Sequence, residues 1–564
     1  MIRIVASLIL VWLGTSALAQ GPHAGFEPRE GRRHLAFNLA DLNDWSTQAP
    51  FIDVMRTARA WIGHRPGQWG GMDEAELRDG GFLDDDGWML RVPPALSHVS
   101  TLVLTDLPAE MTSMAGRYHA RWEGSAPLGF GGAARNVRYA GRSASFDFAP
   151  GAGAVSIEFR RGDLRNLSVV HERHLDAFER GEIFNPDWLA RIGDAENLRF
   201  MDWMRTNNAT MAHWHERPRP EDYTWARNGV PLEVMLALAN QTGAEPWFTL
   251  PHLADDDFVR RFTEAVRDGL RPDLRAWIEF SNEVWNWSFA QADWAEQNAR
   301  ARWGQEWAWV QFYALRAAQV MDIAAEVFAE SPERLVRVLG IFTGWLGLEQ
   351  DILNAPLWQA EAPGNRAPHH AFDAYAVTGY FSAELHTEER QPMLRDWLAE
   401  SAQAAGERAE ADGLAGAARD AFIHKHRFDL ALERAGRELL DGGVSGQREN
   451  SVRHLLEHTL AHHARAAAAH DLALVMYEGG THVVVEPAQH DNAELVAFFA
   501  ALNYSAEMGA LYRALIEGWN ALTPAPFNAY SDIYAPTIWG SWGALRHLDD
   551  ANPRWQALMD ATQP

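Results

Sequence analysis

The chain has 564 residues, 47% of them apolar, which is enough for one large domain or for one large and one small domain. Its 76 acidic residues against 50 basic ones give a net charge of -26, which argues against a nucleic-acid partner. The absence of cysteine excludes structural disulfides, thiol catalysis and cysteine-ligated zinc. The 25 tryptophans exceed what a core requires, and their flat apolar faces suit stacking on sugar rings or bases.

Residues 1–19 have the pattern of a secretory signal peptide. Arg3 supplies the positive end, residues 4–13 the apolar stretch and Ala17-Leu18-Ala19 the small-residue cleavage site. The apolar stretch is too short for a membrane span, and no later segment is long and apolar enough. We therefore predict an exported protein that begins near Gln20 and acts in the periplasm or outside a bacterial cell.

Residues 20–165 are mostly strand-like. Short alternating runs at 97–108, 116–124 and 154–163 are separated by Gly, Pro and Asp turns, which predicts a β-sandwich domain. We expect this domain to pack on the next one and to contribute no catalytic residue. The alternative is that the segment 34–46, "HLAFNLADLNDWS", supplies the first strand of the next domain. The sandwich would then be an insertion, and Asn38 would lie in that next domain.

Residues 166–564 alternate apolar strands with amphipathic helices. The eight strand candidates are 167–172, 197–204, 245–252, 275–283, 335–345, 374–381, 472–480 and 535–543. This rhythm predicts an α/β fold, a (β/α)₈ TIM barrel, with an Ala-rich helical insertion at 393–471 between the sixth and seventh strands. A doubly wound sheet is the alternative, but no Gly-rich phosphate loop follows any of these strands.

Two glutamates stand at strand ends that should face each other across the barrel mouth. Glu283 ends "IEFSNE" on the fourth strand, and Glu478 lies in "VMYEGG" on the seventh. The carboxyl ends of the strands carry the chemistry of such barrels. Two opposed carboxyls are what glycosidic cleavage needs: one protonates the leaving oxygen, and the other attacks the anomeric carbon or activates water. We therefore predict Glu283 and Glu478 as the catalytic residues.

Other residues near the strand ends are predicted to bind substrate or to hold the glutamates in place. They are Asn282, Arg199, His252, Tyr380, Trp285, Trp539 and Trp542. The Arg, His and Tyr of this set can donate hydrogen bonds to Glu478 and keep it ionised. Trp285, with Trp287, can give Glu283 apolar surroundings, and Asn282 can bond a substrate hydroxyl. For Asp202, a place in the cleft and a structural hydrogen bond remain equal alternatives.

These motifs resemble glycoside hydrolase clan A, the retaining (β/α)₈ glycosidases. "IEFSNE" is similar to the Asn-Glu acid/base motif of that clan and "VMYEGG" to its nucleophile strand, over roughly residues 166–545. The resemblance implies that Arg199, His252 and Tyr380 surround the nucleophile, and that Trp539 or Trp542 floors the adjacent sugar subsite. The clan often has His two residues before the Tyr, and here that position is Thr378. The strings "EPWFTLPHLADDDFVR" and "EFSNEVWN" also resemble secreted bacterial proteins described as cellulose-binding.

We predict a retaining glycoside hydrolase whose partner is a carbohydrate substrate, with no cofactor, metal or membrane span. One alternative is a non-catalytic carbohydrate-binding protein on a degenerate barrel. Another is a polysaccharide lyase acting on uronates through a Tyr/His or Lys/Arg constellation, which the acidic net charge and the lack of a basic cluster at the strand ends make the weakest alternative. His213 and His215 in "AHWHERP" could bind a metal, but substrate contact or packing is the preferred interpretation. The sugar, the linkage, endo or exo action and the oligomeric state do not follow from the sequence.

Overall fold

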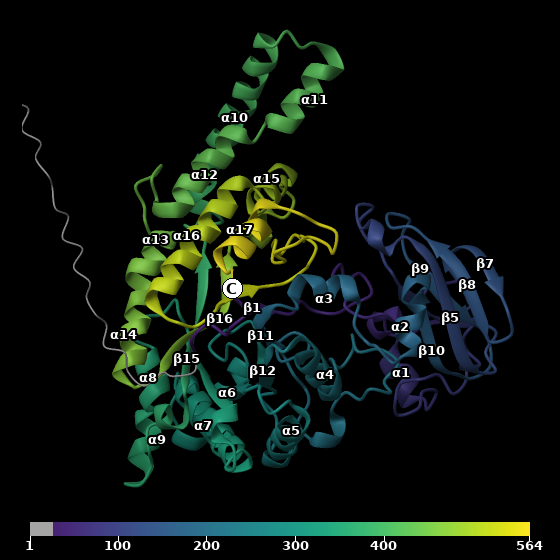
Figure 1. Ribbon diagram of the computed structural model, residues 1–564, viewed down its shortest axis with the longest axis horizontal. Coiled ribbons are helices and arrows are strands. Elements are labelled where there is room, and N and C mark those ends of the chain that lie inside the picture. The colour runs from purple at the N-terminus through teal and green to yellow at the C-terminus, as the bar shows by residue number, and fades with distance from the viewer. Residues whose placement is uncertain (1–25, 564) are drawn as a thin grey trace, which may run out of the picture.

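The computed structural model describes residues 26–563, so the predicted signal peptide lies outside the described residues. At the centre is a closed barrel of eight parallel strands, in the order β1-β11-β12-β13-β14-β15-β16-β17 (Figure 1). The barrel strands are β1 (Arg33–Asn38), β11 (Ala195–Arg199), β12 (Glu245–Leu250), β13 (Ala276–Phe280), β14 (Leu335–Gly340), β15 (Ala374–Phe381), β16 (Ala473–Thr481) and β17 (Phe527–Tyr530). The predicted (β/α)₈ barrel is confirmed.

The barrel strands are apolar along most of their length because both faces are covered. Every residue of β12, β13 and β16 is buried, with one face in the barrel interior and the other against helices. The helices up to β15 are α1 (Glu74–Asp79), α2 (Leu175–Glu179), α3 (Pro186–Ile192), α4 (Leu232–Thr242), α5 (Asp256–Gly269), α6 (Ala290–Trp303), α7 (Trp309–Val327), α8 (Glu349–Asn354) and α9 (Pro356–Glu361). Asp255 caps α5 by accepting from the backbone N–H of Phe258.

The first barrel strand lies near the start of the described chain, and the predicted domain boundary at 165/166 is therefore wrong. β1 pairs in parallel with β11 on one side and with β17 on the other, and this pairing closes the barrel. The segment 167–172, predicted to be the first barrel strand, lies instead in β10 (Leu164–His171) up to its last residue, and β10 pairs antiparallel with β5. The alternative interpretation, in which 34–46 supplies the first strand, is the arrangement observed.

The last barrel strand also differs from its predicted position. β17 covers Phe527–Tyr530, whereas the predicted segment 535–543 forms a loop after it. Phe527, Asn528 and Ala529 are buried, as the closing strand requires, while Trp539 in the loop is 63% exposed. The aromatic run at 535–543 lies at the barrel mouth rather than in the wall.

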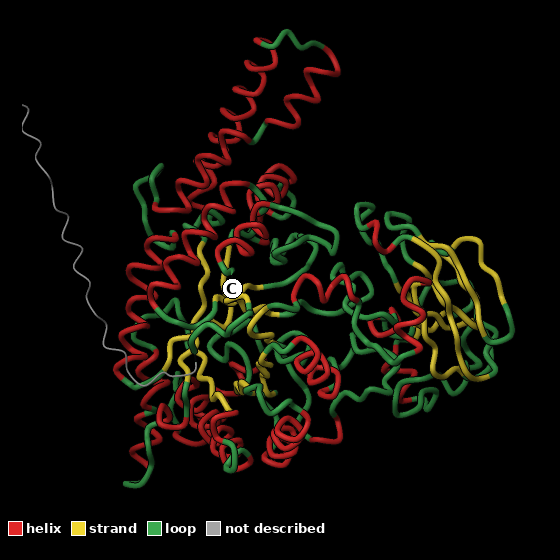
Figure 2. Tube along the Cα trace, in the orientation of Figure 1, coloured by secondary structure: helices red, strands yellow, loops and turns green. Residues whose placement is uncertain are grey.

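Between β1 and β11 the chain forms two antiparallel sheets, seen on the right of Figures 1 and 2. One has the order β10-β5-β8-β7 and the other β3-β2-β4-β9-β6. Their strands are β2 (Ile62–His64), β3 (Gly71–Met72), β4 (His98–Val103), β5 (Gly116–Gly124), β6 (Gly129–Gly132), β7 (Arg135–Tyr139), β8 (Ser143–Phe148) and β9 (Val155–Phe159), together with β10. Phe130 of the second sheet stacks on Phe146 of the first, with ring centroids 5.4 Å apart.

Between β15 and β16 the chain is helical. The helices there are α10 (Gln391–Ala411), α11 (Gly416–His426), α12 (Asp429–Asp441), α13 (Val452–His454) and α14 (Ala461–Ala469). After β16 come α15 (Ala493–Asn503), α16 (Ala506–Leu522) and, after β17, α17 (Pro553–Ala561). In Figure 2 the pair α10 and α11 projects away from the barrel as a helical hairpin. Over residues 26–563, no helix combines the length and the apolar character needed to cross a membrane.

Candidate active site

A cleft of about 810 Å³ lies at the barrel mouth, where the strands end. Its walls include the loops after β13 and β14 and residues of β15, β16 and β17. A π-helical turn at Leu455–Leu460 also contributes Leu455 and Thr459 to the wall. Both glutamates predicted from the sequence, Glu283 and Glu478, line this cleft.

Glu478 is held by two donors and is 5% exposed. Arg199 Nη1 donates to its Oε1 at 2.9 Å, and the Tyr380 hydroxyl donates to its Oε2 at 2.8 Å. Each carboxylate oxygen therefore has one strong donor, and one of the two donors is a cation. This fixes the side chain in a single orientation.

Glu283 is held by neutral donors instead. The Tyr477 hydroxyl donates to its Oε1 at 3.0 Å, and the side-chain amide of Asn286 donates to its Oε2 at 3.0 Å. The backbone turns sharply here, with φ of 61° at Ser281 and 41° at Glu283. Left-handed backbone at residues other than glycine is unfavourable and gathers at functional sites, where the fold imposes it.

The two carboxyls interact electrostatically. Burial raises the pKa of the Glu478 carboxyl to about 8, and repulsion by Glu283 adds to this, while Arg199 and Tyr380 oppose it. Glu478 thus has a cationic partner in Arg199, whereas Glu283 has only neutral donors, so the two carboxyls lie in electrostatically unlike surroundings.

Arg199 is fully buried and connects four side chains at the base of the cleft. Besides Glu478, its guanidinium donates to Asn38 Oδ1 at 2.9 Å and to Asn282 Oδ1 at 2.8 Å. It also donates twice to Glu279 Oε2, at 3.1 and 2.9 Å. The side-chain oxygen of Asn282 therefore already accepts a hydrogen bond within the protein, and the Asn282 NH₂ group donates to Asn207 Oδ1 at 3.1 Å.

His252 does not contact either glutamate, so the expected hydrogen bond to Glu478 is absent. It is 3% exposed, packs edge-on against Trp294 at 5.5 Å and does not line the cleft. Burial lowers its pKa to about 4, which keeps the imidazole neutral. The position of His252 at the end of its strand did not indicate that the ring packs against Trp294 of α6 instead of facing the cleft.

The tryptophans lie where the cleft needs apolar walls. Trp285 is buried, stacks on Phe342 at 6.2 Å and lines the cleft, as Trp287 also does. Trp542 lies 6.1 Å from Tyr380 and lines the cleft. It also lines an adjoining pocket of about 220 Å³, called the side arm below, which shares Tyr530 and Trp542 with the cleft. Trp539 lines the arm but not the cleft.

The side arm is acidic. Asp202 lines this pocket together with Asp41 and does not line the cleft itself, and it also accepts a hydrogen bond from a neighbouring tyrosine. Burial and then repulsion by Asp41 raise the pKa of Asp202 to about 7. The Tyr530 hydroxyl contacts Asp202 at 3.5 Å, and Arg205 pairs with Asp41 at 3.3 Å.

Four contacting residues were not predicted: Asn38, Glu279, Tyr477 and Asn286. Asn38 was missed because β1 was not assigned to the barrel. Glu279 is buried within β13, two residues before the first turn residue Ser281, and an acid inside an otherwise apolar strand could have indicated it. Tyr477 directly precedes Glu478, yet its side chain bonds the other glutamate.

Away from the cleft, three side chains of the kinds that bind metal ions lie together between α8 and α14. Ligand atoms of Glu349, His462 and His463 lie within 4.8 Å of one another. His463 Nε2 is already 3.0 Å from the Thr343 carbonyl oxygen, and its Nδ1 is 2.6 Å from the Tyr375 hydroxyl. With both nitrogens engaged, His463 has no lone pair free for a metal, and the group is better understood as a structural brace.

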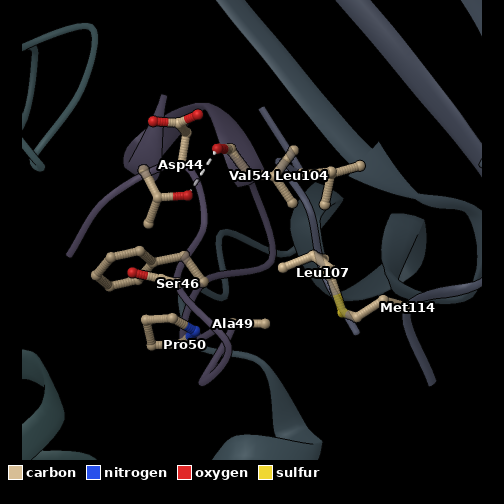
Figure 3. A pocket seen from close by; sticks show the side chains of 10 residues that line it. Asp44, Ser46, Ala49, Pro50, Val54, Leu104, Leu107 and Met114 are labelled. Carbon is tan, nitrogen blue, oxygen red and sulfur yellow. Dashed lines mark hydrogen bonds between the residues drawn. The ribbon is translucent and has the colours of Figure 1, made fainter. Parts of the chain in front are cut away.

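Figure 3 shows a much smaller pocket, lined by Asp44, Ser46, Leu104 and Met114 among others. Its volume of about 20 Å³ has room for about one water molecule and not for a sugar ring. The barrel-mouth cleft is therefore the candidate site.

No protein-family model matches the chain, and no curated protein sequence does either. Among solved structures, the chain is similar to the CBM22-1–GH10 modules of an endo-1,4-β-D-xylanase 10B from Clostridium thermocellum, complexed with xylohexaose. The identity is 8% and the TM-score 0.33, over 93% of this chain and 96% of that one.

Proposed function

We propose that the protein is a retaining glycoside hydrolase with Glu283 as acid/base and Glu478 as nucleophile. The observation that carries the proposal is the unlike hydrogen bonding of two carboxyls in one cleft. Glu478 accepts from a buried guanidinium and Glu283 only from neutral groups. A glycosidase needs one ionised and one protonated carboxyl, and the buried cation beside Glu478 favours the ionised form of that carboxyl.

In the first step, Glu283 protonates the glycosidic oxygen while Glu478 attacks the anomeric carbon and forms a covalent glycosyl-enzyme. In the second step, Glu283 takes a proton from water, which attacks the same carbon and releases Glu478. Double displacement retains the anomeric configuration. It requires the two carboxyls to lie about 5–5.5 Å apart, without room for a water molecule between them.

The first test is covalent labelling. Incubation with activated 2-fluoroglycosides, followed by peptide mass spectrometry, should place the label on Glu478 alone. Proton NMR of the first product should show the substrate's anomeric configuration. Label on another residue, or an inverted product, would contradict the assignment, and the search for the pair would then restart with Asp202. Absence of hydrolysis across a broad glycan panel would favour the carbohydrate-binding alternative.

The substrate class is proposed to be a carbohydrate met outside the cytoplasm, because residues 1–19 have the pattern of an export signal and the cleft walls carry aromatic rings. A lyase acting on uronates is disfavoured. The residues lining the cleft and its arm include four carboxyls, Glu283, Glu478, Asp41 and Asp202, and no Lys or Arg within the described part of the chain.

A further inference from the structure

Exposed tryptophans gather around the barrel mouth. Six are exposed among residues 26–563, and five of them lie on segments that follow barrel strands. These five are Trp45 after β1, Trp287 after β13, Trp307 in the connection between α6 and α7, Trp345 after β14 and Trp539 after β17. The sixth, Trp69, lies in the turn between β2 and β3. Large apolar side chains held in water at one end of a fold commonly mark a binding surface.

Trp287 and Trp307 form a continuous group that starts inside the cleft. Trp287 lines the cleft, and its ring lies 5.9 Å from that of Trp307, at an interplanar angle of 76°. Both contact Trp309, at 5.2 and 6.2 Å, and Trp309 is buried at the start of α7. The buried ring anchors the two exposed rings, which therefore present a preformed surface next to the cleft.

Trp307 is held in a conformation that stability alone does not explain. Its φ is +64°, in the left-handed region that bulky residues disfavour, and its side chain is 71% exposed. An indole in water adds little to the core, so the fold carries an unfavourable backbone conformation to present this ring. Such strain is a feature of binding and catalytic sites.

Charge restricts what the surface can bind. The cleft and its arm are lined by four carboxyls and by no Lys or Arg among the described residues, and the chain as a whole has a net charge of -26. Uronic acid and sulfated chains would be repelled. An uncharged sugar chain would not be repelled, and its apolar C–H faces stack on indole rings.

We propose that Trp287 and Trp307 form a platform for the sugar units on the leaving-group side of an uncharged polysaccharide. We choose this side because Trp287 lines the cleft in the same loop as Glu283, the proposed acid that protonates the leaving oxygen. This assignment rests on the proposed function. It makes the protein an enzyme that prefers long chains to short ones.

The test compares substrates of different length. Trp307→Gly relieves the backbone strain, so its thermal unfolding midpoint should be equal to or higher than that of the wild type. We compare kcat/KM on soluble neutral polymers (mixed-linkage β-glucan, arabinoxylan and glucomannan) with kcat/KM on short aryl glycosides of the same sugar. The ratio of the two should fall about tenfold in Trp307→Gly, because one stacking contact with the long chain is lost. Trp307→Tyr should restore most of this ratio. Trp69→Ala, which removes an equally exposed indole from the β-rich region, is the matched control and should leave the ratio unchanged.

An unchanged ratio in Trp307→Gly, or equal losses on short and long substrates, would overturn the platform while leaving the hydrolase intact. Cleavage of polygalacturonate or alginate at rates comparable to the neutral polymers would overturn the charge argument. Binding is measured separately by affinity electrophoresis in gels containing the same polymers. Trp307-dependent retardation without any cleavage would uphold the platform and refute the proposed hydrolase.

Discussion

Arg199 and Glu478 form a buried ion pair, with Nη1 2.9 Å from Oε1 and the guanidinium fully enclosed. The same guanidinium also neutralises Glu279. Replacing Arg199 with Met should therefore leave two buried carboxyls without their cation and lower the free energy of unfolding by about 3–5 kcal/mol. Urea titration followed by tryptophan fluorescence measures this. Arg261→Met, at an exposed pair with Asp257, should change it by less than about 1 kcal/mol.

The roles of the two glutamates can be separated with azide. Glu283→Ala should nearly abolish cleavage of natural glycans and spare substrates with activated leaving groups, which need little protonation. Added azide should then attack the glycosyl-enzyme and give a glycosyl azide of retained configuration. In Glu478→Ala, azide should replace the nucleophile and give the inverted azide. The same configuration from both variants would show that one assignment is wrong.

Removing the Tyr380 hydroxyl should change the pH profile. Its hydrogen bond favours ionised Glu478, so Tyr380→Phe should raise the pKa of Glu478 further above its usual range. The nucleophile then loses its charge at a higher pH, and the acidic limb of kcat/KM should move upward, with kcat about tenfold lower at neutral pH. Tyr118→Phe, which removes a buried hydrogen bond to the Met114 carbonyl in the β-rich region, should leave the profile unchanged. A uniform loss at every pH would indicate a purely structural role.

Asp202 should make the protein less stable in alkali. Its pKa is raised to about 7 by burial, so between the unfolded value near 4 and the folded value the native state binds the proton more tightly. The free energy of unfolding therefore falls as the pH rises through this window, and the loss is complete above pH 7. Asp202→Asn should stabilise the protein at pH 8 more than at pH 4, by on the order of 2 kcal/mol. Differential scanning calorimetry at both pH values, with the exposed Asp85→Asn as control, tests this.

The barrel and its pair of glutamates could be predicted because they depend on local signals. Buried parallel strands are apolar along their length, and a carboxylate at such an end is conspicuous, as at Glu283 and Glu478. β1 could not be assigned with the same ease, because it is separated by the two sheets from β11, its neighbour in the barrel. Strand pairing over so long a separation leaves no periodic trace in the sequence.

Side-chain direction was the other limit. Tyr477 and Glu478 are adjacent in β16, yet Tyr477 donates to Glu283 whereas Glu478 accepts from Arg199. His252 is buried away from the cleft, although it follows a strand that ends at the barrel mouth. Such choices depend on packing against neighbouring strands and helices. Arg199 was predicted correctly as a donor to Glu478, but its links to Asn38 and Glu279 required the positions of three strands.

The place of β1 has a consequence for building shorter forms of the protein. The chain leaves the barrel after β1 and returns before β11 at one spot, where Phe51 and Phe184 form an antiparallel bridge. Ile52 N–H donates to the Ile183 carbonyl, and Asn185 N–H to the Pro50 carbonyl. Truncation from the N-terminus up to residue 165 would remove β1 from the barrel and prevent the barrel from closing. A short turn that replaces the segment between Phe51 and Phe184 would instead keep all eight barrel strands in one chain.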